Sequence, residues 1–229
     1  MSKIITTAKS GMVSKVLEWT YARAINGFGG VDSAYQLGND YLNSKGTLDQ
    51  QVDQLIKWQV TKAASSGFFT GLGGWAIMPF ALPANIASVI YIQVRMISAI
   101  AYMGGHDIQS DQVKSIIYVC MLGNGTKEIF KEMGIKAGEK FVKSLIENTS
   151  RKMLLSVNEK VSVNIASKLG SRSLTGLGKA IPIVGGVIGG SFDAGSTLII
   201  GKVAKKMFID NGKSILNQER EETGIPSVV

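Results

Sequence analysis

The chain has 229 residues, a formal net charge of +8, 45% hydrophobic residues, one cysteine and one histidine. This length is sufficient for a core that buries most of the apolar surface, so stability does not require cross-links. The single cysteine and single histidine exclude an intramolecular disulfide framework and any metal site built from several Cys or His ligands.

The amino-terminal residues indicate a cytoplasmic protein without a signal peptide, because Lys9 and Lys15 interrupt the apolar stretch that a secretory signal needs. A first amphipathic helix is predicted next, ending at the glycine-rich turn 26–30. Its inward positions recur at helical spacing and are Val13, Val16, Leu17, Thr20, Tyr21 and Ala24.

Two further helices are predicted before residue 63. The first covers about 32–42, and the second follows Thr47, whose spacing to Gln50 is that of a capping box. Leu48, Val52, Leu55, Ile56 and Gln59 continue one face of the second. We expect amino-terminal helices over 1–46, a main helical domain over 47–213 and a polar tail over 214–229.

Residues 63–94 contain no Asp, Glu, Lys or Arg, and Arg95 ends the run. The run exceeds the roughly 20 apolar residues that span a bilayer, but prolines interrupt it, which predicts a helical hairpin over about 60–104. We expect the hairpin to be buried in protein or inserted in lipid. The candidate packing or insertion residues are Gly67, Gly71, Gly74, Trp75, Pro79 and Pro83.

The second arm of this hairpin, from Pro83 to about Met103, is apolar nearly all round. A narrow polar stripe along it consists of Ser88, Tyr91, Arg95, Ser98 and Tyr102. Downstream, Ser110 or Asp111 caps a predicted helix through Leu122, and Thr126 begins a basic amphipathic helix after a Gly-Asn-Gly stop. Another helix is predicted over about 150–169, with Leu154, Val157, Val161 and Ile165 on one side.

A second apolar segment, about 174–209, repeats the Gly-Leu-Gly opening of the first and its Ala-Ile pair before a proline, which predicts a second hairpin. Its last arm is expected to begin near Ser191. Two overlapping GxxxG spacings follow the proline, and the candidate packing residues are Pro182, Gly185, Gly186, Gly189 and Gly190. The predicted fold class is therefore an all-α bundle built around two Gly/Pro-marked hairpins.

Arg95 is the lone charge of its apolar arm, and Asp193 is the only acidic residue between Glu159 and Asp210. We hypothesise that they form a buried ion pair where the hairpins meet. The alternative has Asp193 as an exposed helix cap and Arg95 extended to an edge.

Positive charge is concentrated in residues 151–213, which hold ten basic residues against three acidic ones. Lys202, Lys205 and Lys206 are candidate contacts for anionic lipid headgroups. Nucleic acid is the less favoured partner, because its binding surfaces place aromatic residues among the basic ones, and this segment contains few aromatic residues. The alternative is a set of solvated lysines that keep the protein soluble.

No catalytic motif is found. The Gly-Lys pairs lack the earlier glycine of a nucleotide P-loop, and the GxGxxA match at 71–76 follows a predicted helix rather than a strand. His106 does not lie in a sequence motif that would pair it with a catalytic nucleophile. We therefore expect a protein that is not an enzyme and that has no cofactor, metal or nucleic-acid partner.

Several of these features together resemble the EcsC family of bacterial proteins, over most of residues 50–210. The residues that carry the resemblance are Gly71-Leu72-Gly73-Gly74, Pro79, Leu82-Pro83, Arg95, Ile100-Ala101-Tyr102-Met103-Gly104, Asp107, Ile181-Pro182-Ile183-Val184-Gly185-Gly186, Ala204 and Phe208. The resemblance implies a helical, membrane-associated protein without an established catalytic activity.

Three functions stay open. The first is a non-catalytic protein at the inner face of the bacterial membrane, bound to anionic lipid and to a membrane-protein partner or a second copy. The second is an antibacterial effector that inserts its hairpins and depolarises the membrane. The third is a soluble interaction module whose hairpins stay in the core.

Overall fold

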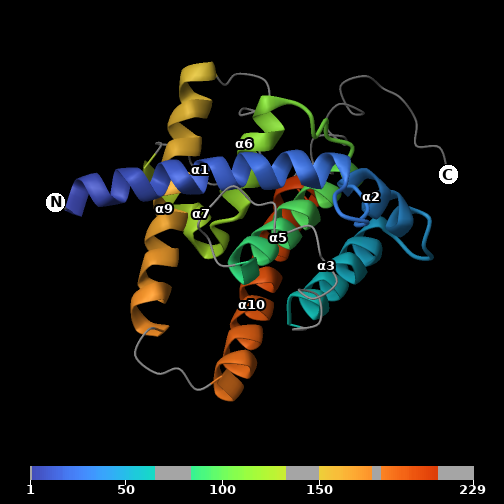
Figure 1. Ribbon diagram of the computed structural model, residues 1–229. Helices are drawn as coiled ribbons and strands as arrows, with labels where there is room; N and C mark the ends of the chain where they lie inside the picture. Colours follow the sequence, from blue (N-terminus) through green and yellow to red (C-terminus); the bar gives the residue numbers. More distant parts are fainter. Residues whose placement is uncertain (1, 65–83, 133–149, 177–181, 211–229) are drawn as a thin grey trace.

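The computed structural model describes residues 2–64, 84–132, 150–176 and 182–210, and for 2–10, 84–87, 130–132, 168–176 and 182–193 it describes the backbone alone. Within these ranges every regular element is a helix, so the predicted all-α class is confirmed (Figure 1). The α-helices are α1 (Ser2–Asn26), α2 (Ala34–Leu42), α3 (Leu48–Ala64), α5 (Ala84–Met103), α6 (Asp111–Cys120), α7 (Thr126–Glu132), α9 (Arg151–Gly176) and α10 (Pro182–Lys205). Gly123–Gly125 forms the 3-10 helix η2, and Lys206–Asp210 forms the π-helix η3.

Side-chain caps define where the early helices begin. The predicted capping box of α3 is confirmed, since the Thr47 amide donates to Gln50 Oε1 at 3.0 Å and the Gln50 amide donates to Thr47 Oγ1 at 3.4 Å. A second box, which we did not predict, begins α2 through Ser33 and Gln36. Ser110 caps α6 as expected, because its Oγ accepts from the Val113 amide.

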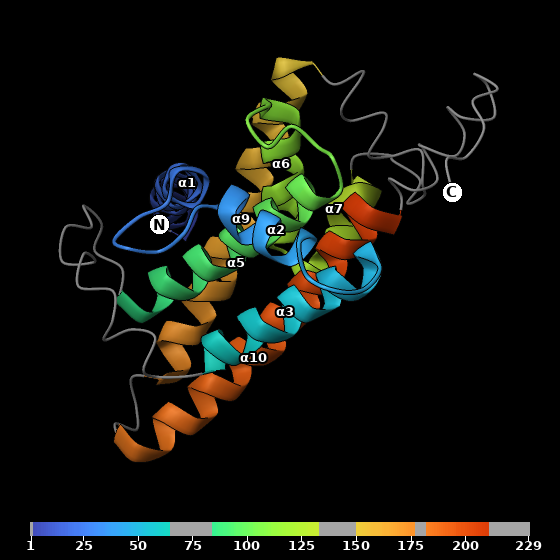
Figure 2. The same cartoon turned by 90° about the vertical axis from the view of Figure 1, so that its right-hand side faces the viewer.

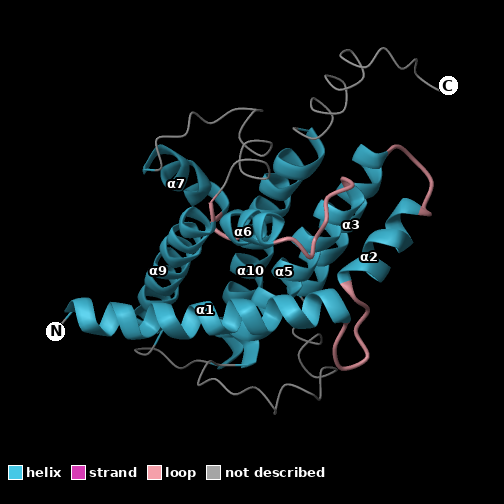
Figure 3. Cartoon of the chain, turned by 90° about the horizontal axis from the view of Figure 1, so that it is seen from above, coloured by secondary structure: helices cyan, strands magenta, loops and turns pink. Residues whose placement is uncertain are grey.

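α1 runs along one edge of the bundle beside α9 and α5 (Figure 3). Every residue predicted for its inward face is buried. The helix ends in a tight turn in which Phe28 and Val31 exchange two main-chain hydrogen bonds around Gly29 and Gly30. Both glycines have positive φ, a conformation that costs other residues more, so the predicted glycine turn is confirmed.

The centre of the bundle is α5, which is contacted by α1, α2, α3, α6 and α10 (Figure 2). All of its residues from 88 to 101 are buried. A helix that is apolar nearly all round requires such an enclosure. The described part of the predicted second arm is therefore buried in protein.

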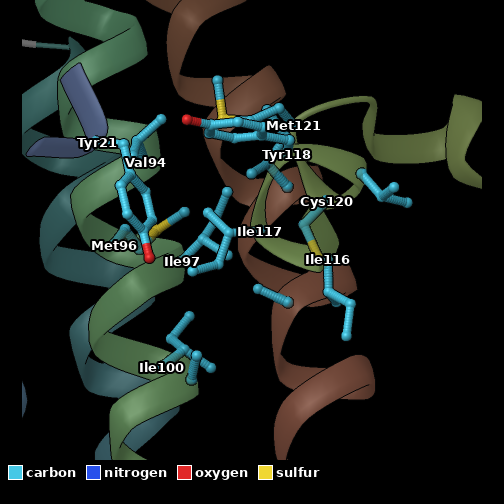
Figure 4. Packing of buried hydrophobic residues seen from close by; sticks show 14 of the residues in the cluster. Tyr21, Val94, Met96, Ile97, Ile100, Ile116, Ile117, Tyr118, Cys120 and Met121 are labelled. Atoms are coloured by element: carbon cyan, nitrogen blue, oxygen red, sulfur yellow. The ribbon is translucent and has the colours of Figure 1, made fainter. Parts of the chain in front are cut away.

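One hydrophobic core unites the amino-terminal helices with the rest. Tyr21 of α1 packs edge-on against Tyr118 of α6 with ring centroids 5.8 Å apart, and Ile97 of α5 points toward Ile117 of α6 (Figure 4). The cluster extends through the buried faces of α1, α3, α5, α6, α9 and α10. The predicted boundary at residue 46 thus does not separate two cores.

The second apolar segment differs from its prediction. Residues 182–205 form one continuous helix, α10, so the last arm begins at Pro182 rather than near Ser191. Pro182 is the first residue of α10, where a missing amide donor is tolerated, and the glycines that follow lie within the helix. α10 packs along α3, with Gly201 against Ile56, because a Cβ added to Gly201 would lie 2.8 Å from Ile56 Cγ2.

Candidate functional site

Arg95 is the one charged side chain of α5, and only 3% of it is exposed. Its Nη1 donates a hydrogen bond to the main-chain carbonyl oxygen of Asp32 at 2.9 Å. Burial lowers the pKa of Arg95, while Tyr91 and the Asp32 carboxylate oppose that shift. The guanidinium is therefore satisfied by the segment before α2 and by its own helix.

A second cation lies near this site. Burial and the positive charge of Arg95 both lower the pKa of Lys62, at the end of α3. The Lys62 ammonium also lies 5.6 Å from the centroid of the Trp58 ring. The region between α2, α3 and α5 is thus locally positive.

The expected partner of Arg95 lies on α10. Gln93 Nε2 donates to Ser196 Oγ at 3.2 Å and to Thr197 Oγ1 at 3.1 Å, which defines the face of α5 that meets α10. Arg95 is two residues further, about 200° around the helix, and so points away from α10. The side chain of Asp193 lies outside the described residues, so the Arg95–Asp193 ion pair stays a prediction, but the described contacts do not favour it.

The three candidate lipid-binding lysines divide into two groups. Lys205 Nζ contacts Asp49 Oδ2 at 2.9 Å and Asp53 Oδ1 at 2.7 Å, and 14% of its side chain is exposed. These two carboxylates raise the pKa of Lys205 against the effect of burial. A lipid contact by Lys205 does not fit this arrangement, because its charge is neutralised by α3, whereas Lys202 and Lys206 are exposed.

The outward face of α10 combines apolar and basic residues. Leu198 and Ile199 are each 38% exposed, although both are large apolar side chains. Gly195, Lys202 and Lys206 are exposed on the same side of the helix. We call these five residues the α10 outer face.

The sequence predicted Gln59 only as one residue of the inward face of the helix that follows Thr47. The side chain of Gln59 is fully buried in α3, and neither its amide nitrogen nor its amide oxygen has a hydrogen-bond partner among the residues that the structure describes. The sequence shows that a glutamine occupies an inward helical position. It cannot show whether the amide has hydrogen-bond partners, because these depend on the helices packed around it.

The remaining predicted hairpin residues cannot be compared with the structure. Gly67, Gly71, Gly74, Trp75, Pro79 and Pro83 lie outside the described residues. Gly185, Gly186, Gly189 and Gly190 lie in the helical backbone of α10, where side-chain surroundings are not described. Their role in close helix packing stays a prediction.

The single histidine of the chain is half-buried and its single cysteine is buried. His106 Nε2 lies 3.2 Å from the Phe208 carbonyl oxygen, and burial lowers the pKa of His106. Cys120 is buried, which raises the pKa of its thiol. Over the described ranges no group of three or more His, Cys, Asp or Glu residues could hold a metal ion. Among the described helices, none is both long enough and apolar enough to cross a bilayer.

These features define an all-α protein with a buried arginine in its central helix, and the last α-helix that the structure describes is apolar and basic on its outer side. The profile of the EcsC protein family matches residues 3–209, so the chain belongs to the EcsC family. The match begins within α1, well before residue 47, where the main domain was predicted to start. Searches among curated proteins and among solved structures gave no match.

Proposed function

We propose that this protein acts without catalysis as a peripheral component of the inner face of a bacterial membrane, where anionic lipid headgroups hold it. The observation that carries the proposal is the net charge of +8, together with exposed basic residues at the beginning of α9 and at the end of α10 and the start of η3. Arg151, Lys152, Lys202 and Lys206 are all exposed. Each basic residue near an anionic membrane surface contributes about 1 kcal/mol to binding.

Peripheral binding fits the fold better than insertion of α5. The residues of α5 from 88 to 101 are already buried by other helices, so this helix gains little by moving into lipid. Insertion would also separate Arg95 from the Asp32 carbonyl and carry an arginine into the bilayer, which is costly.

A non-catalytic role is supported by the state of the usual reactive groups. The imidazole of His106 is packed against the Phe208 ring, with centroids 5.2 Å apart, and is bonded to the carbonyl of the same residue. The Cys120 thiol is buried, and its raised pKa disfavours the reactive thiolate.

Vesicle flotation of the full chain tests the proposal. We expect the protein to float with vesicles that contain phosphatidylglycerol, not with phosphatidylcholine alone, and to be released by high salt, because salt screens surface charges. Equal flotation with both vesicles, or with neither, would contradict the proposal. Release of a trapped dye from the anionic vesicles would favour the membrane-inserting alternative instead.

A further inference from the structure

We infer that the α10 outer face is the surface that meets the anionic bilayer. This inference rests on the proposed function and adds the place of contact to it. Its members come from two turns of one helix and the start of η3, and they are Gly195, Leu198, Ile199, Lys202 and Lys206.

The geometry of α10 gathers these residues on one side. At about 100° per residue, Gly195, Leu198, Ile199 and Lys202 fall within an arc of about 100°, and Lys206 follows one turn after Lys202. The inward residues of the same turns, Thr197, Ile200 and Ala204, are buried. A Cβ built on Gly195 would meet no atom within 4 Å, so the backbone there is open to an approaching surface.

The lysines at the end of α10 and the start of η3 differ in whether they are paired with carboxylates of the described residues, and the unpaired ones are available to an anionic surface. Lys205 turns toward α3, where Asp49 and Asp53 neutralise it, although these two side chains are themselves 46% and 60% exposed. Lys202 and Lys206 form no ion pair with any residue that the structure describes. One exposed carboxylate, Asp210, lies a turn beyond Lys206 and would weaken binding at that end.

The mixture of side chains suits a helix that lies in the plane of the interface. Such a helix places bulky apolar residues at the boundary between headgroups and acyl chains, and its lysines extend to the phosphates. Leu198 and Ile199 would supply the apolar contact, and Lys202 and Lys206 the charge. An anionic bilayer matches both properties, whereas a purely electrostatic partner would leave the two apolar side chains unused.

α9 offers a matched control surface. Leu155 is 62% exposed, more than Leu198 or Ile199, and it is accompanied by the exposed Arg151 and Lys152. It therefore has an exposed apolar residue and two positive charges on a different helix. Comparing matched substitutions on the two helices therefore distinguishes the effect of losing the binding surface from the effect of lowering the total charge.

The experiment measures partition to phosphatidylglycerol vesicles by flotation. We expect Lys202→Gln/Lys206→Gln to lower the partition coefficient about thirty-fold, because two headgroup contacts are lost. Arg151→Gln/Lys152→Gln removes the same charge and should cause a much smaller loss. Leu198→Gln should weaken binding more than Leu155→Gln, and Asp210→Asn should strengthen it. Unchanged thermal unfolding of each variant would show that the fold is intact.

The outcomes separate this inference from the proposed function. If the wild-type protein floats and both charge pairs cause equal losses, the α10 outer face is the wrong surface although membrane binding stands. If the wild-type protein does not float, the proposed function itself fails. If Leu198→Gln abolishes a dimer in sedimentation velocity but leaves flotation unchanged, the face binds a second copy and the inference is overturned.

Discussion

The guanidinium of Arg95 donates a hydrogen bond to the main-chain carbonyl of Asp32, 63 residues earlier, across 2.9 Å. The bond joins the middle of the most buried helix to the residue just before Ser33, the N-cap of α2. Since the acceptor belongs to the main chain, the contact depends on where the chain runs rather than on the side chain at position 32. Arg95 therefore fixes the path between α1 and α2.

Replacing Arg95 should lower the stability of the fold much more than replacing Asp32. We expect Arg95→Lys to lower the free energy of unfolding by about 2 kcal/mol, because a hydrogen bond from a charged group is lost and a charge stays buried. Asp32→Asn keeps the carbonyl, and its side chain is exposed, so it should change stability little. Equilibrium urea unfolding measures both. An equal loss in the two variants would mean that the Asp32 carboxylate, not the carbonyl, holds Arg95.

The relation between Arg95 and Asp193 can be decided by a double-mutant cycle. We expect Arg95→Ala and Asp193→Ala to lose stability additively, because Gln93 occupies the face of α5 toward α10 and Arg95 points elsewhere. A coupling free energy of about 1 kcal/mol or more, again from urea unfolding, would instead support the ion pair inferred from the sequence.

The sequence predicted those features that depend on spacing along one helix. The inward faces of α1 and α9 follow from apolar residues recurring at helical intervals, and Leu154, Val157, Val161 and Ile165 of α9 are all buried as predicted. The Thr47 capping box follows from two residues three positions apart. The same spacing, Ser33 to Gln36, was present before α2 and could have been identified.

Features that depend on a second helix were not predictable in the same way. Lys205 and Lys206 are adjacent in sequence, and only the position of α3, with Asp49 and Asp53, determines that Lys205 is the paired one. The sequence suggested Asp193 as a partner of Arg95, because a carboxylate can be identified from the sequence. The acceptor that the structure describes is the main-chain carbonyl of Asp32, and since every residue carries such a group, the sequence cannot single it out.

Gln59 should be replaceable with a gain in stability. Both of its side-chain polar atoms are buried and have no hydrogen-bond partner in the described part of the chain, and each such group costs about 1–3 kcal/mol. We expect Gln59→Leu to raise the midpoint of thermal unfolding by several degrees. Gln51→Leu is the control and should lower it, because Gln51 Nε2 donates to the carbonyls of Leu42 and Ser44 at 3.1 and 2.8 Å. A loss of stability on Gln59→Leu would indicate that the amide has partners in the folded protein.

Gly104 should not tolerate a side chain. A Cβ at this position would lie 2.4 Å from the Phe208 carbonyl oxygen, which belongs to the backbone and cannot easily move. We expect Gly104→Ala to cost about 2 kcal/mol or more in unfolding free energy. Gly11→Ala, where nothing lies within 4 Å, should be neutral or stabilising because alanine favours the helix. Similar effects of the two substitutions would contradict the close approach of η3 to the end of α5.

The stability of the fold should fall as His106 becomes protonated. Burial lowers the pKa of His106 below its usual value of 6.5, so between the two values the unfolded chain binds more protons than the folded one. Stability is therefore complete above about pH 6.5 and decreases as the pH falls through this window. Thermal unfolding at successive pH values measures the slope.

This slope can be assigned to one residue because the chain has a single histidine. We expect His106→Gln to flatten the pH dependence just below about pH 6.5, since no other side chain ordinarily titrates there. The glutamine amide can still donate to the Phe208 carbonyl, so stability at pH 7 should change less than the slope does. If the variant keeps the wild-type slope, another group titrates in this window and His106 is protonated equally in the folded and unfolded states.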